Sequence, residues 1–426
     1  MMRRIFNNQY FRNVVTLTIG SSIGYGVIVA VSPLLTRLYS PEQLGSFALM
    51  MAVVNMLSPV INGHYEFQIV SVGPEVEAAT ITVTSMFFGL AFTLVSAVAL
   101  AVFSSVRMGF AEGAFSIIFY AIPLLIIAAI VTPLSNYNNR HKQYRLLASM
   151  TVIRTTTQAV GQVLLGFGRF GVGGLIAAQI LSSVVGVKRQ ARVAWDNRAV
   201  FQAVTWKQVT LTLRRYYKQP LYSASALLLC AFAYSSVIFI MGNLYGLREV
   251  GYYSLTFSLL GLPLTLVTRN VASVFLQKAG HEKTISGHFT QTYRHTLGLL
   301  AVISIPTFGV LMCVSEPLFG LLFGKGWERA GYFVKILCPM FALRFMATSL
   351  EHALFIANRQ RTKFMLQLSF PLEVFAAYCL TRAWNCPADQ FLMMVSALFS
   401  VSYVGLAWFS WRASCHHSPP FQTGTP

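Results

Sequence analysis

The chain has 426 residues, of which 55% are hydrophobic and only 11% are charged, and its mean hydropathy is +0.60. A typical soluble domain carries about 25% charged residues, so this chain could not cover its surface with polar groups in water. The composition excludes a soluble enzyme, a disordered protein and a nucleic-acid-binding domain. It predicts an all-α integral membrane protein with many spans.

The charge balance and the cysteines limit the kinds of site and partner that this chain is expected to have. The 32 Lys and Arg residues outnumber the 13 Asp and Glu residues and give a net charge of +19. In membrane proteins such an excess has a simple cause, because cytoplasmic loops are enriched in Lys and Arg. The six cysteines form no CxxC pair and no metal-ligand spacing. We therefore expect neither a metal site nor a nucleic-acid partner.

Apolar runs of helical length follow one another along the chain. A helix that crosses a hydrocarbon core of about 30 Å needs roughly 20 predominantly apolar residues. Counting such runs predicts about twelve transmembrane helices. Their ranges are 14–36, 44–63, 78–103, 114–136, 147–167, 172–187, 220–242, 250–275, 295–314, 331–356, 364–381 and 391–411. The sixth run is the shortest, and only a glycine-rich stretch separates it from the fifth.

The loops between these spans fall into two sets of different charge. One set, which includes both ends of the chain and the segment 188–218, holds about 21 Lys and Arg residues. The loops of the other set hold about seven. The positive-inside rule places the basic set in the cytoplasm. An even number of spans then puts both the N-terminus and the C-terminus in the cytoplasm.

A basic segment near the middle of the sequence divides the chain into two halves. We expect a six-helix bundle over residues 1–190 and a second six-helix bundle over residues 220–412. Residues 191–219 are expected to form a basic cytoplasmic linker that lies partly on the anionic leaflet. Residues 413–426 are rich in Pro and polar residues and are expected to form a disordered cytoplasmic tail.

The two halves share a short pattern. Leu38-Tyr39 precedes Gly45 in the loop before the second span, and Leu244-Tyr245 precedes Gly251 before the eighth. The two stretches lie 206 positions apart, close to half the chain. Because six spans separate them, both halves insert with the same orientation, which predicts a parallel repeat. Two such bundles commonly hold a substrate cavity between them and alternate its access.

The loop sequences resemble a known family. Pro33-Leu-Leu-Thr-Arg-Leu-Tyr-Ser-Pro-Glu-Gln-Leu-Gly45 resembles the start of Wzx-type polysaccharide flippases, which belong to the multidrug/oligosaccharidyl-lipid/polysaccharide exporter (MOP) superfamily. Later segments are similar to the same family in the same order. They are Tyr65-Glu66, Pro220-Leu-Tyr with Leu244-Tyr-Gly, and Leu322-Phe-Gly-Lys-Gly-Trp327. The family's small residue after the Glu is replaced by Phe67 here.

The resemblance carries expectations for fold and function. It implies a MATE-like fold of two six-helix bundles in the bacterial inner membrane. It also implies translocation of undecaprenyl-diphosphate-linked oligosaccharide repeat units to the periplasmic leaflet by alternating access, as in O-antigen synthesis. No catalytic residue and no cofactor is expected. A coupling ion, H⁺ or Na⁺, is expected to bind during transport. The expected partners are the lipid-linked oligosaccharide, membrane lipids, a polysaccharide polymerase and a chain-length regulator.

Basic residues inside the spans need a physical reason, because each costs about 2.5–3.5 kcal/mol on insertion scales. Arg344 lies near the predicted midplane, too far from either interface to snorkel. A lipid diphosphate is a dense anion, which the planar Arg fork binds through two parallel hydrogen bonds. We expect Arg344, Arg269 and Arg154 to bind the diphosphate in the cavity. The alternative for each is snorkelling or pairing with an acid.

Three carboxylates lie in the spans or at their ends. A coupled transporter needs an acid that titrates or binds a cation. Glu373 follows Pro371 by two residues, at a point where a freed backbone carbonyl could share a proton or an ion. Glu66 and Glu351 are the other candidates for binding the coupling ion. Each of the three acids could instead pair with a nearby Arg.

Two other function classes stay open at this stage. A cation-coupled multidrug exporter of the same superfamily would need an acidic, aromatic site, whereas the spans here hold four bases and about three acids. A membrane polysaccharide polymerase would need a sizeable outside loop for its acceptor site. The outside loops of this chain all have fewer than about 18 residues, within ordinary connection lengths.

Overall fold

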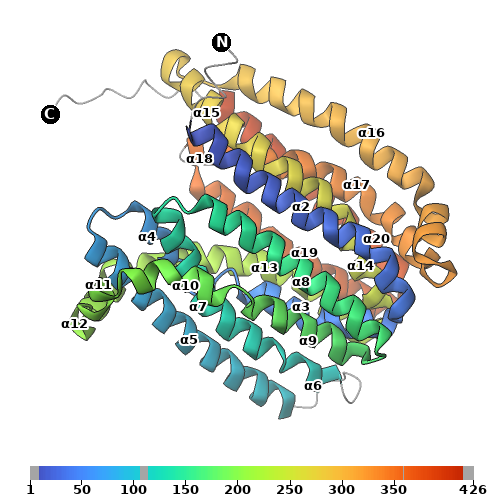
Figure 1. Cartoon of the computed structure of the whole chain (residues 1–426). Helices are drawn as coiled ribbons and strands as arrows, with labels where there is room; N and C mark the ends of the chain where they lie inside the picture. Colours follow the sequence, from blue (N-terminus) through green and yellow to red (C-terminus); the bar gives the residue numbers. More distant parts are fainter. Residues whose placement is uncertain (1–8, 106–113, 358, 416–426) are drawn as a thin grey trace. The chain divides into compact units, whose positions relative to one another are not determined.

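The computed structural model describes residues 9–105, 114–357 and 359–415, and every regular element in these ranges is helical (Figure 1). The predicted all-α fold class is therefore confirmed. The helices before the central basic segment are α2 (Gln9–Leu38), α3 (Pro41–Leu57), η1 (Tyr65–Phe67), α4 (Gln68–Ser71), α5 (Glu75–Ser105), α6 (Ala114–Ile118), α7 (Ala121–Arg140), α8 (Tyr144–Phe167) and α9 (Gly171–Val184).

Three short helices follow, and then the helices of the second half. The short ones are α10 (Val187–Asp196), α11 (Arg198–Gln202) and α12 (Trp206–Arg215). The later elements are η2 (Gln219–Ala224), α13 (Ser225–Tyr245), α14 (Leu247–Pro263), η3 (Leu264–Thr268), α15 (Arg269–Ser286), α16 (Thr290–Phe323), η4 (Lys325–Trp327), α17 (Glu328–Leu350), α18 (His352–Ile356), α19 (Gln360–Trp384) and α20 (Ala388–Cys415).

Helices occupy all twelve predicted spans, with two interruptions worth noting. The end of the second span, 58–63, is a turn instead of helix. The eighth span is broken after Pro263 by the π-helical stretch η3, because proline lacks the N–H that would continue the helical ladder. In the described part of the chain, eight helices are long and apolar enough to cross a membrane. The count of about twelve therefore stays a prediction.

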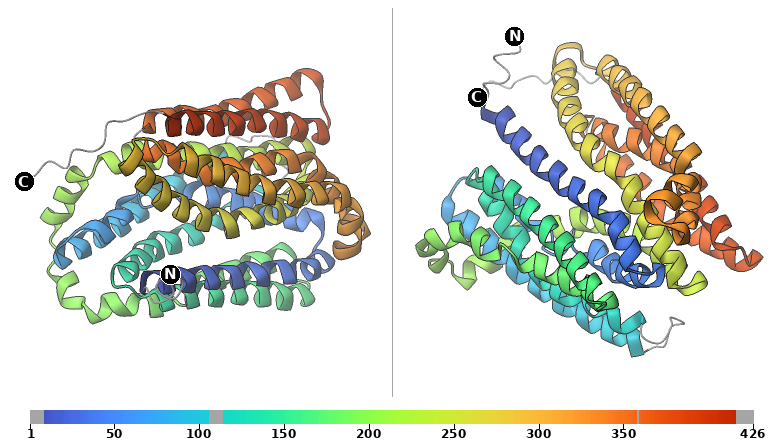
Figure 2. Two further views of the ribbon diagram at one scale, coloured as in Figure 1. Left: turned by 90° about the horizontal axis from the view of Figure 1, so that it is seen from above. Right: turned by 45° about the vertical axis from the view of Figure 1, so that its right-hand side comes forward.

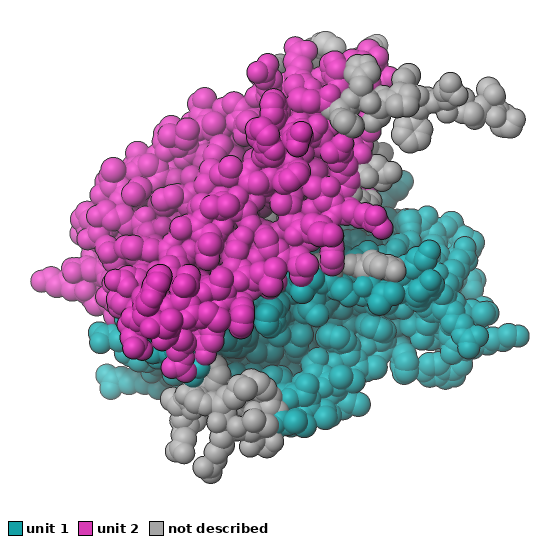
Figure 3. Space-filling view, turned by 180° about the vertical axis from the view of Figure 1, so that it is seen from behind, with its two compact units in different colours: residues 1–251 teal, residues 252–426 magenta. Residues whose placement is uncertain are grey.

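The helices form two compact units, residues 1–251 and 252–426 (Figure 3). This division falls later than the predicted linker, because α13 packs against α3 of the first unit. Ser235 of α13 donates a hydrogen bond to the backbone oxygen of Ala52 in α3 at 2.9 Å. The boundaries of the two membrane bundles stay a prediction. Residues 413–415 of the predicted tail are still helical, and 416–426 lie outside the described residues.

Each unit is built from long helices packed in pairs. In the first unit α2 lies along α8 and α5 along α7, and in the second unit α16 lies along α17 and α19 along α20 (Figures 1 and 2). A core in the first unit joins α3 to α6, α7 and α9. Its buried residues are Leu49, Met50, Val53, Ile118, Ala121, Leu124 and Ile176. These apolar contacts set the position of α3.

The two copies of the repeated pattern meet each other inside the first unit. A Cβ atom added at Gly45 would lie 1.8 Å from the backbone oxygen of Leu247, and one added at Gly251 would lie 2.0 Å from that of Pro41. Pro41 and Leu247 are equivalent positions of the repeat, as are Gly45 and Gly251. The contact is therefore reciprocal, as across a two-fold axis. This reciprocity agrees with the predicted repeat.

The predicted linker is helical, which the sequence analysis did not foresee. α10, α11 and α12 turn their apolar sides toward α5 and α7, where Val193, Phe201 and Leu213 join a cluster around Tyr65 and Tyr137. A short amphipathic helix is unstable alone but forms when one face is buried. The basic residues of the segment are exposed on the other side. They are Lys188, Arg189, Arg192, Arg198, Lys207, Arg214, Arg215 and Lys218.

Ionic contacts fix this end of the first unit. Arg140 at the end of α7 pairs with Glu75 at 3.1 Å and donates hydrogen bonds to the backbone oxygens of Ile69, Val72 and Gly73. The hydroxyl of Tyr137 donates to the Glu75 carboxylate at 2.6 Å. One guanidinium thus closes the turn between α4 and α5, whose carbonyls would otherwise lack partners.

We expect Gly45→Ala to destabilise the protein by about 3 kcal/mol, because the new methyl group meets a backbone carbonyl that cannot rotate away. Gly251→Ala is expected to have an effect of the same size, since the contact is reciprocal. Thermal unfolding in detergent, followed by size-exclusion chromatography, measures both. The matched control is Gly26→Ala, whose added methyl meets nothing within 4 Å. Unchanged melting of the two variants would contradict the reciprocal contact.

Candidate functional site

Arg344 lies in the last third of α17 and is flanked by two aromatic rings. Its guanidinium carbon lies 5.4 Å from the ring centroid of Phe257 in α14 and 5.4 Å from that of Phe341, one turn earlier in α17. The two rings pack edge to face on each other at 5.2 Å. A guanidinium over an aromatic face is attracted by the ring quadrupole, and the attraction is strongest where water is excluded. The aromatic pair therefore fixes the half-buried guanidinium in place.

Several contacts hold α14 and α17 together so that this arrangement forms. The hydroxyl of Thr256 donates a hydrogen bond to the backbone oxygen of Ala330 at 2.8 Å. The ring of Tyr252 packs edge to face on Trp327, with centroids 5.6 Å apart. Both contacts lie within the second unit. They bring Phe257 to Arg344, although the two residues are far apart in the sequence.

The other two predicted diphosphate ligands are placed differently. Arg154 of α8 is half-buried in the first unit, where its Nη2 donates to the backbone oxygen of Ser183 at 3.4 Å. Its Nε is buried without a hydrogen-bond partner. Arg269 is the first residue of α15, directly after the π-helical stretch η3, and its side chain lies outside the described part of the structure. The diphosphate role of the three arginines stays a prediction.

Glu373 lies in a chain of hydroxyl groups between α19 and α20. The hydroxyl of Ser402 donates a hydrogen bond to Oε1 of Glu373 and lies 2.6 Å from the hydroxyl of Ser369. Oε2 of Glu373 is buried and has no hydrogen-bond partner. A buried carboxylate oxygen without a partner is costly unless it carries a proton or faces a cation. The coupling-ion role of Glu373 stays a prediction.

The two other acids have different surroundings. Glu351, at the end of α17, pairs with Lys363 of α19 at 3.1 Å, so its charge is already compensated. Glu66 lies in η1, is only 3% exposed, and has one carboxylate oxygen buried without a partner. The buried turn before it is fixed by the side-chain amide of Asn62, which donates to the backbone oxygens of Ser85 and Ala129 at 2.9 Å each.

Sequence reasoning found the charged residues but missed their neighbours. Ser369 and Glu373 are four residues apart, so their shared helix face could have been predicted. No signal in the sequence points to Ser402 or Phe257, which come from other helices. No group of three or more His, Cys, Asp or Glu residues in the described ranges could hold a metal ion.

Solved structures of membrane transporters share this fold. The lipid II flippase MurJ, in an inward closed conformation, matches over 94% of this chain and 87% of its own, with a TM-score of 0.74 and 12% identity. A multidrug resistance MATE family transporter of the MOP superfamily, in an inward-facing conformation, matches over 94% of each chain, with a TM-score of 0.65 and 16% identity. The chain thus has the fold of the MOP-superfamily transporters.

The match between this sequence and a known family shows to which family the chain belongs. Residues 34–331 match the family of polysaccharide biosynthesis proteins, and the chain belongs to this family. The succinoglycan biosynthesis transport protein ExoT of Rhizobium meliloti (strain 1021) is 26% identical over 332 residues, which are 75% of this chain and 63% of ExoT. The match thus spans less than two thirds of that relative. The family and its structural neighbours are transporters and flippases, not enzymes, as the sequence analysis predicts.

The burial of Glu66 leads to a prediction about pH. Burial raises the pKa of Glu66 from 4.5 to about 7. The folded state therefore binds this proton more tightly than the unfolded state, and the resulting stability is lost as the pH rises through about 7. We expect Glu66→Gln to raise the stability at pH 8 by about 3 kcal/mol and to change it little at pH 4.5.

Thermal unfolding of the purified protein at the two pH values measures this difference. Asp196→Asn, which removes an exposed acid on α10, is the matched control and is expected to leave the pH profile unchanged. A Glu66→Gln variant with the wild-type pH profile would contradict the prediction.

Proposed function

We propose that the chain is a flippase that moves undecaprenyl-diphosphate-linked oligosaccharide repeat units from the cytoplasmic to the periplasmic leaflet of a bacterial inner membrane. The observation that carries the proposal is Arg344, whose guanidinium lies within an apolar helical segment and is flanked by two Phe rings. The proposed mechanism is alternating access, with both termini in the cytoplasm. The products would serve the synthesis of O-antigen or another surface polysaccharide.

The surroundings of Arg344 suit a transient anionic ligand. The quadrupole of the two aromatic rings orients the guanidinium, which stays protonated at any physiological pH. A diphosphate offers the oxygen pairs that the guanidinium fork binds in parallel. Within a low-dielectric helix bundle such a contact is stronger than in water. The site therefore favours an anionic headgroup over an organic cation.

The similar proteins described above also support a cargo that contains glycan. One relative, ExoT, is named as a transport protein of succinoglycan biosynthesis, and one structural neighbour, MurJ, is named as a lipid II flippase. Both names describe carriers of glycan material. For this chain we propose a lipid-linked oligosaccharide as cargo, and a polysaccharide polymerase and a chain-length regulator as functional partners that act on the flipped product.

We also propose that the cycle is coupled to H⁺ or Na⁺ through Glu373. Its carboxylate and the hydroxyls of Ser402 and Ser369 form a set of oxygen atoms from two helices. Oxygen donors of this kind bind hard cations, and the same carboxylate could bind a proton instead. Glu351 is the weaker candidate because Lys363 already neutralises it.

Arg344→Gln is expected to lower flipping about 10- to 100-fold, because a hydrogen bond from a charged group to phosphate is worth about 1.5–3 kcal/mol. Arg344→Lys is expected to fall between this variant and the wild type, because it keeps the charge but loses the planar fork. The assay uses a strain that lacks the chromosomal copy and measures lipid-linked single repeat units and surface polymer. Arg382→Gln, at an exposed position of α19, is the control and is expected to complement fully.

The outcomes separate the proposal from its alternatives. Accumulation of single repeat units on the inner leaflet, without surface polymer, supports the flippase. Unpolymerised units on the outer leaflet of the deletion strain would instead indicate a polymerase. No change in either pool would overturn the flippase and favour a multidrug exporter.

Glu373→Gln is expected to abolish the dependence of transport on an imposed ion gradient while lipid-linked substrate still binds. Ser402→Ala is expected to slow transport about 10-fold, because it removes a hydrogen bond to a carboxylate, and such a bond is worth at least about 1.5 kcal/mol. Proteoliposomes with imposed H⁺ or Na⁺ gradients give the measurement. In the same assay Glu351→Gln is expected to keep its gradient dependence. Gradient-driven transport by Glu373→Gln would refute this role.

A further inference from the structure

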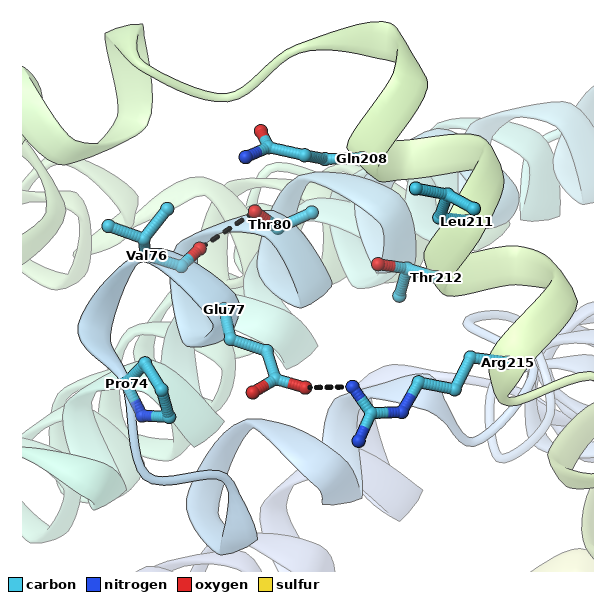
Figure 4. Close-up of a pocket in the computed structure, with 8 residues that line it drawn as sticks. All are labelled: Pro74, Val76, Glu77, Thr80, Gln208, Leu211, Thr212 and Arg215. Atoms are coloured by element: carbon cyan, nitrogen blue, oxygen red, sulfur yellow. Dashed lines mark hydrogen bonds and ion pairs between the residues drawn. The ribbon is translucent and has the colours of Figure 1, made fainter.

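A pocket lies between the first turns of α5 and the linker helix α12 (Figure 4). It shares no residue with the proposed transport site. Its volume is about 330 Å³, at the lower end of the range for small-molecule sites. Glu77 and Thr80 line it from α5, and Gln208 and Arg215 from α12. The pocket lies entirely within the first unit.

One end of the pocket carries a pair of opposite charges. Nη1 of Arg215 lies 3.0 Å from Oε1 of Glu77, and the hydroxyl of Tyr216 donates to the same oxygen at 3.2 Å. The second carboxylate oxygen of Glu77 is directed away from Arg215 (Figure 4). The Arg215 side chain is 70% exposed, so most of its donors face solvent. A negative and a positive group are therefore both available to a ligand.

The other end of the contact between α5 and α12 is apolar. The rings of Phe87 and Trp206 pack edge to face, with centroids 5.1 Å apart, and both side chains are largely exposed. Leu211, on the wall of the pocket, is also exposed. Exposed Trp beside an apolar helix is typical of the membrane–water interface. Contact of this apolar surface with acyl chains is therefore more favourable than its contact with water.

The charged end and the aromatic end of the contact between α5 and α12 lie at different positions along α5. Because Arg215 meets Glu77 while Trp206 meets Phe87, α12 runs antiparallel to the start of α5 over about ten residues of each helix, roughly 15 Å. The helix α5 is one of the segments apolar enough to cross a membrane. The charged end thus lies at the beginning of this span and the aromatic pair lies farther along it. A phospholipid has the same sequence of charged headgroup and apolar chains.

We propose that this pocket binds a phospholipid whose headgroup carries both an ammonium and a phosphate group, that is, an aminophospholipid such as phosphatidylethanolamine. The ammonium binds the free oxygen of Glu77, and the phosphate binds the solvent-facing donors of Arg215. The acyl chains lie along Leu211 and the aromatic pair.

The charge pattern favours this lipid over an anionic one. Eight basic residues and a single acid, Asp196, lie in the segment 187–218, and this excess attracts any anionic leaflet. Inside the pocket, however, Glu77 repels a purely anionic headgroup, and its second carboxylate oxygen can accept a hydrogen bond from an ammonium group. A choline headgroup has the charge but no N–H to donate to the carboxylate. The pocket therefore favours a headgroup that carries both an ammonium and a phosphate group, whereas the surrounding basic surface favours an anionic headgroup.

The test measures which lipids stay bound to the purified full chain. The protein is equilibrated with mixed micelles that contain equal amounts of phosphatidylethanolamine, phosphatidylcholine and phosphatidylglycerol, and retained lipid is quantified by native mass spectrometry. We expect phosphatidylethanolamine to be retained about tenfold over phosphatidylcholine, as for one charge-assisted hydrogen bond. Glu77→Gln is expected to remove this preference.

A second variant tests lipid binding without altering the ion pair between Glu77 and Arg215. Val76→Trp places a bulky ring on the wall of the pocket without changing Glu77 or Arg215 and is expected to lower retention of the lipid in the same way. Arg214→Gln, an exposed neighbour that does not line the pocket, is the matched control. Unaltered melting of each variant shows that it is folded. Equal retention of the three lipids, preference for phosphatidylglycerol, or no retained lipid would each overturn the proposal.

Discussion

The close approach of α3 and α14 is the constraint on which the rest of the fold depends. At Gly45 and Gly251 the two helix backbones leave no room for a side chain. The register of both helices is therefore fixed at this point. From there α3 carries Leu49 and Met50 into the core of the first unit, and α14 carries Phe257 to Arg344 in the second. A shift of one residue at the crossing would turn these side chains to other faces.

The helices could be predicted from the sequence, but the short basic ones could not. A run of about 20 apolar residues has few alternatives to a membrane helix, since lipid leaves no other partner for the backbone. The segment 191–219 lacks such a run, and its high charge favoured a basic cytoplasmic linker. Its helices form because Val193, Phe201 and Leu213 bury one face against Tyr65 and Tyr137. That stabilisation comes from residues far away in the sequence, which a local pattern does not reveal.

The candidate site shows the same limit. An Arg or Glu inside an apolar run stands out in the sequence because it is costly there. Its neighbours decide what it does, and they come from other helices. Glu351 and Glu373 looked alike in the sequence, yet one faces Lys363 and the other two serine hydroxyls. The type of residue was predictable, whereas the difference between a compensated charge and an uncompensated one was not.

The reciprocal crossing also bears on how the chain avoids pairing with itself. Glu42 and Arg248 occupy equivalent positions of the repeat and form an ion pair at 3.5 Å beside the crossing. Both side chains are more than half exposed, so the pair adds little to stability. Two copies of the N-terminal half, meeting in the same way, would bring Glu42 against Glu42. The same exposure to solvent weakens the repulsion between two Glu42 side chains, so the charge difference gives only a small preference for pairing of the two different halves over pairing of two first halves.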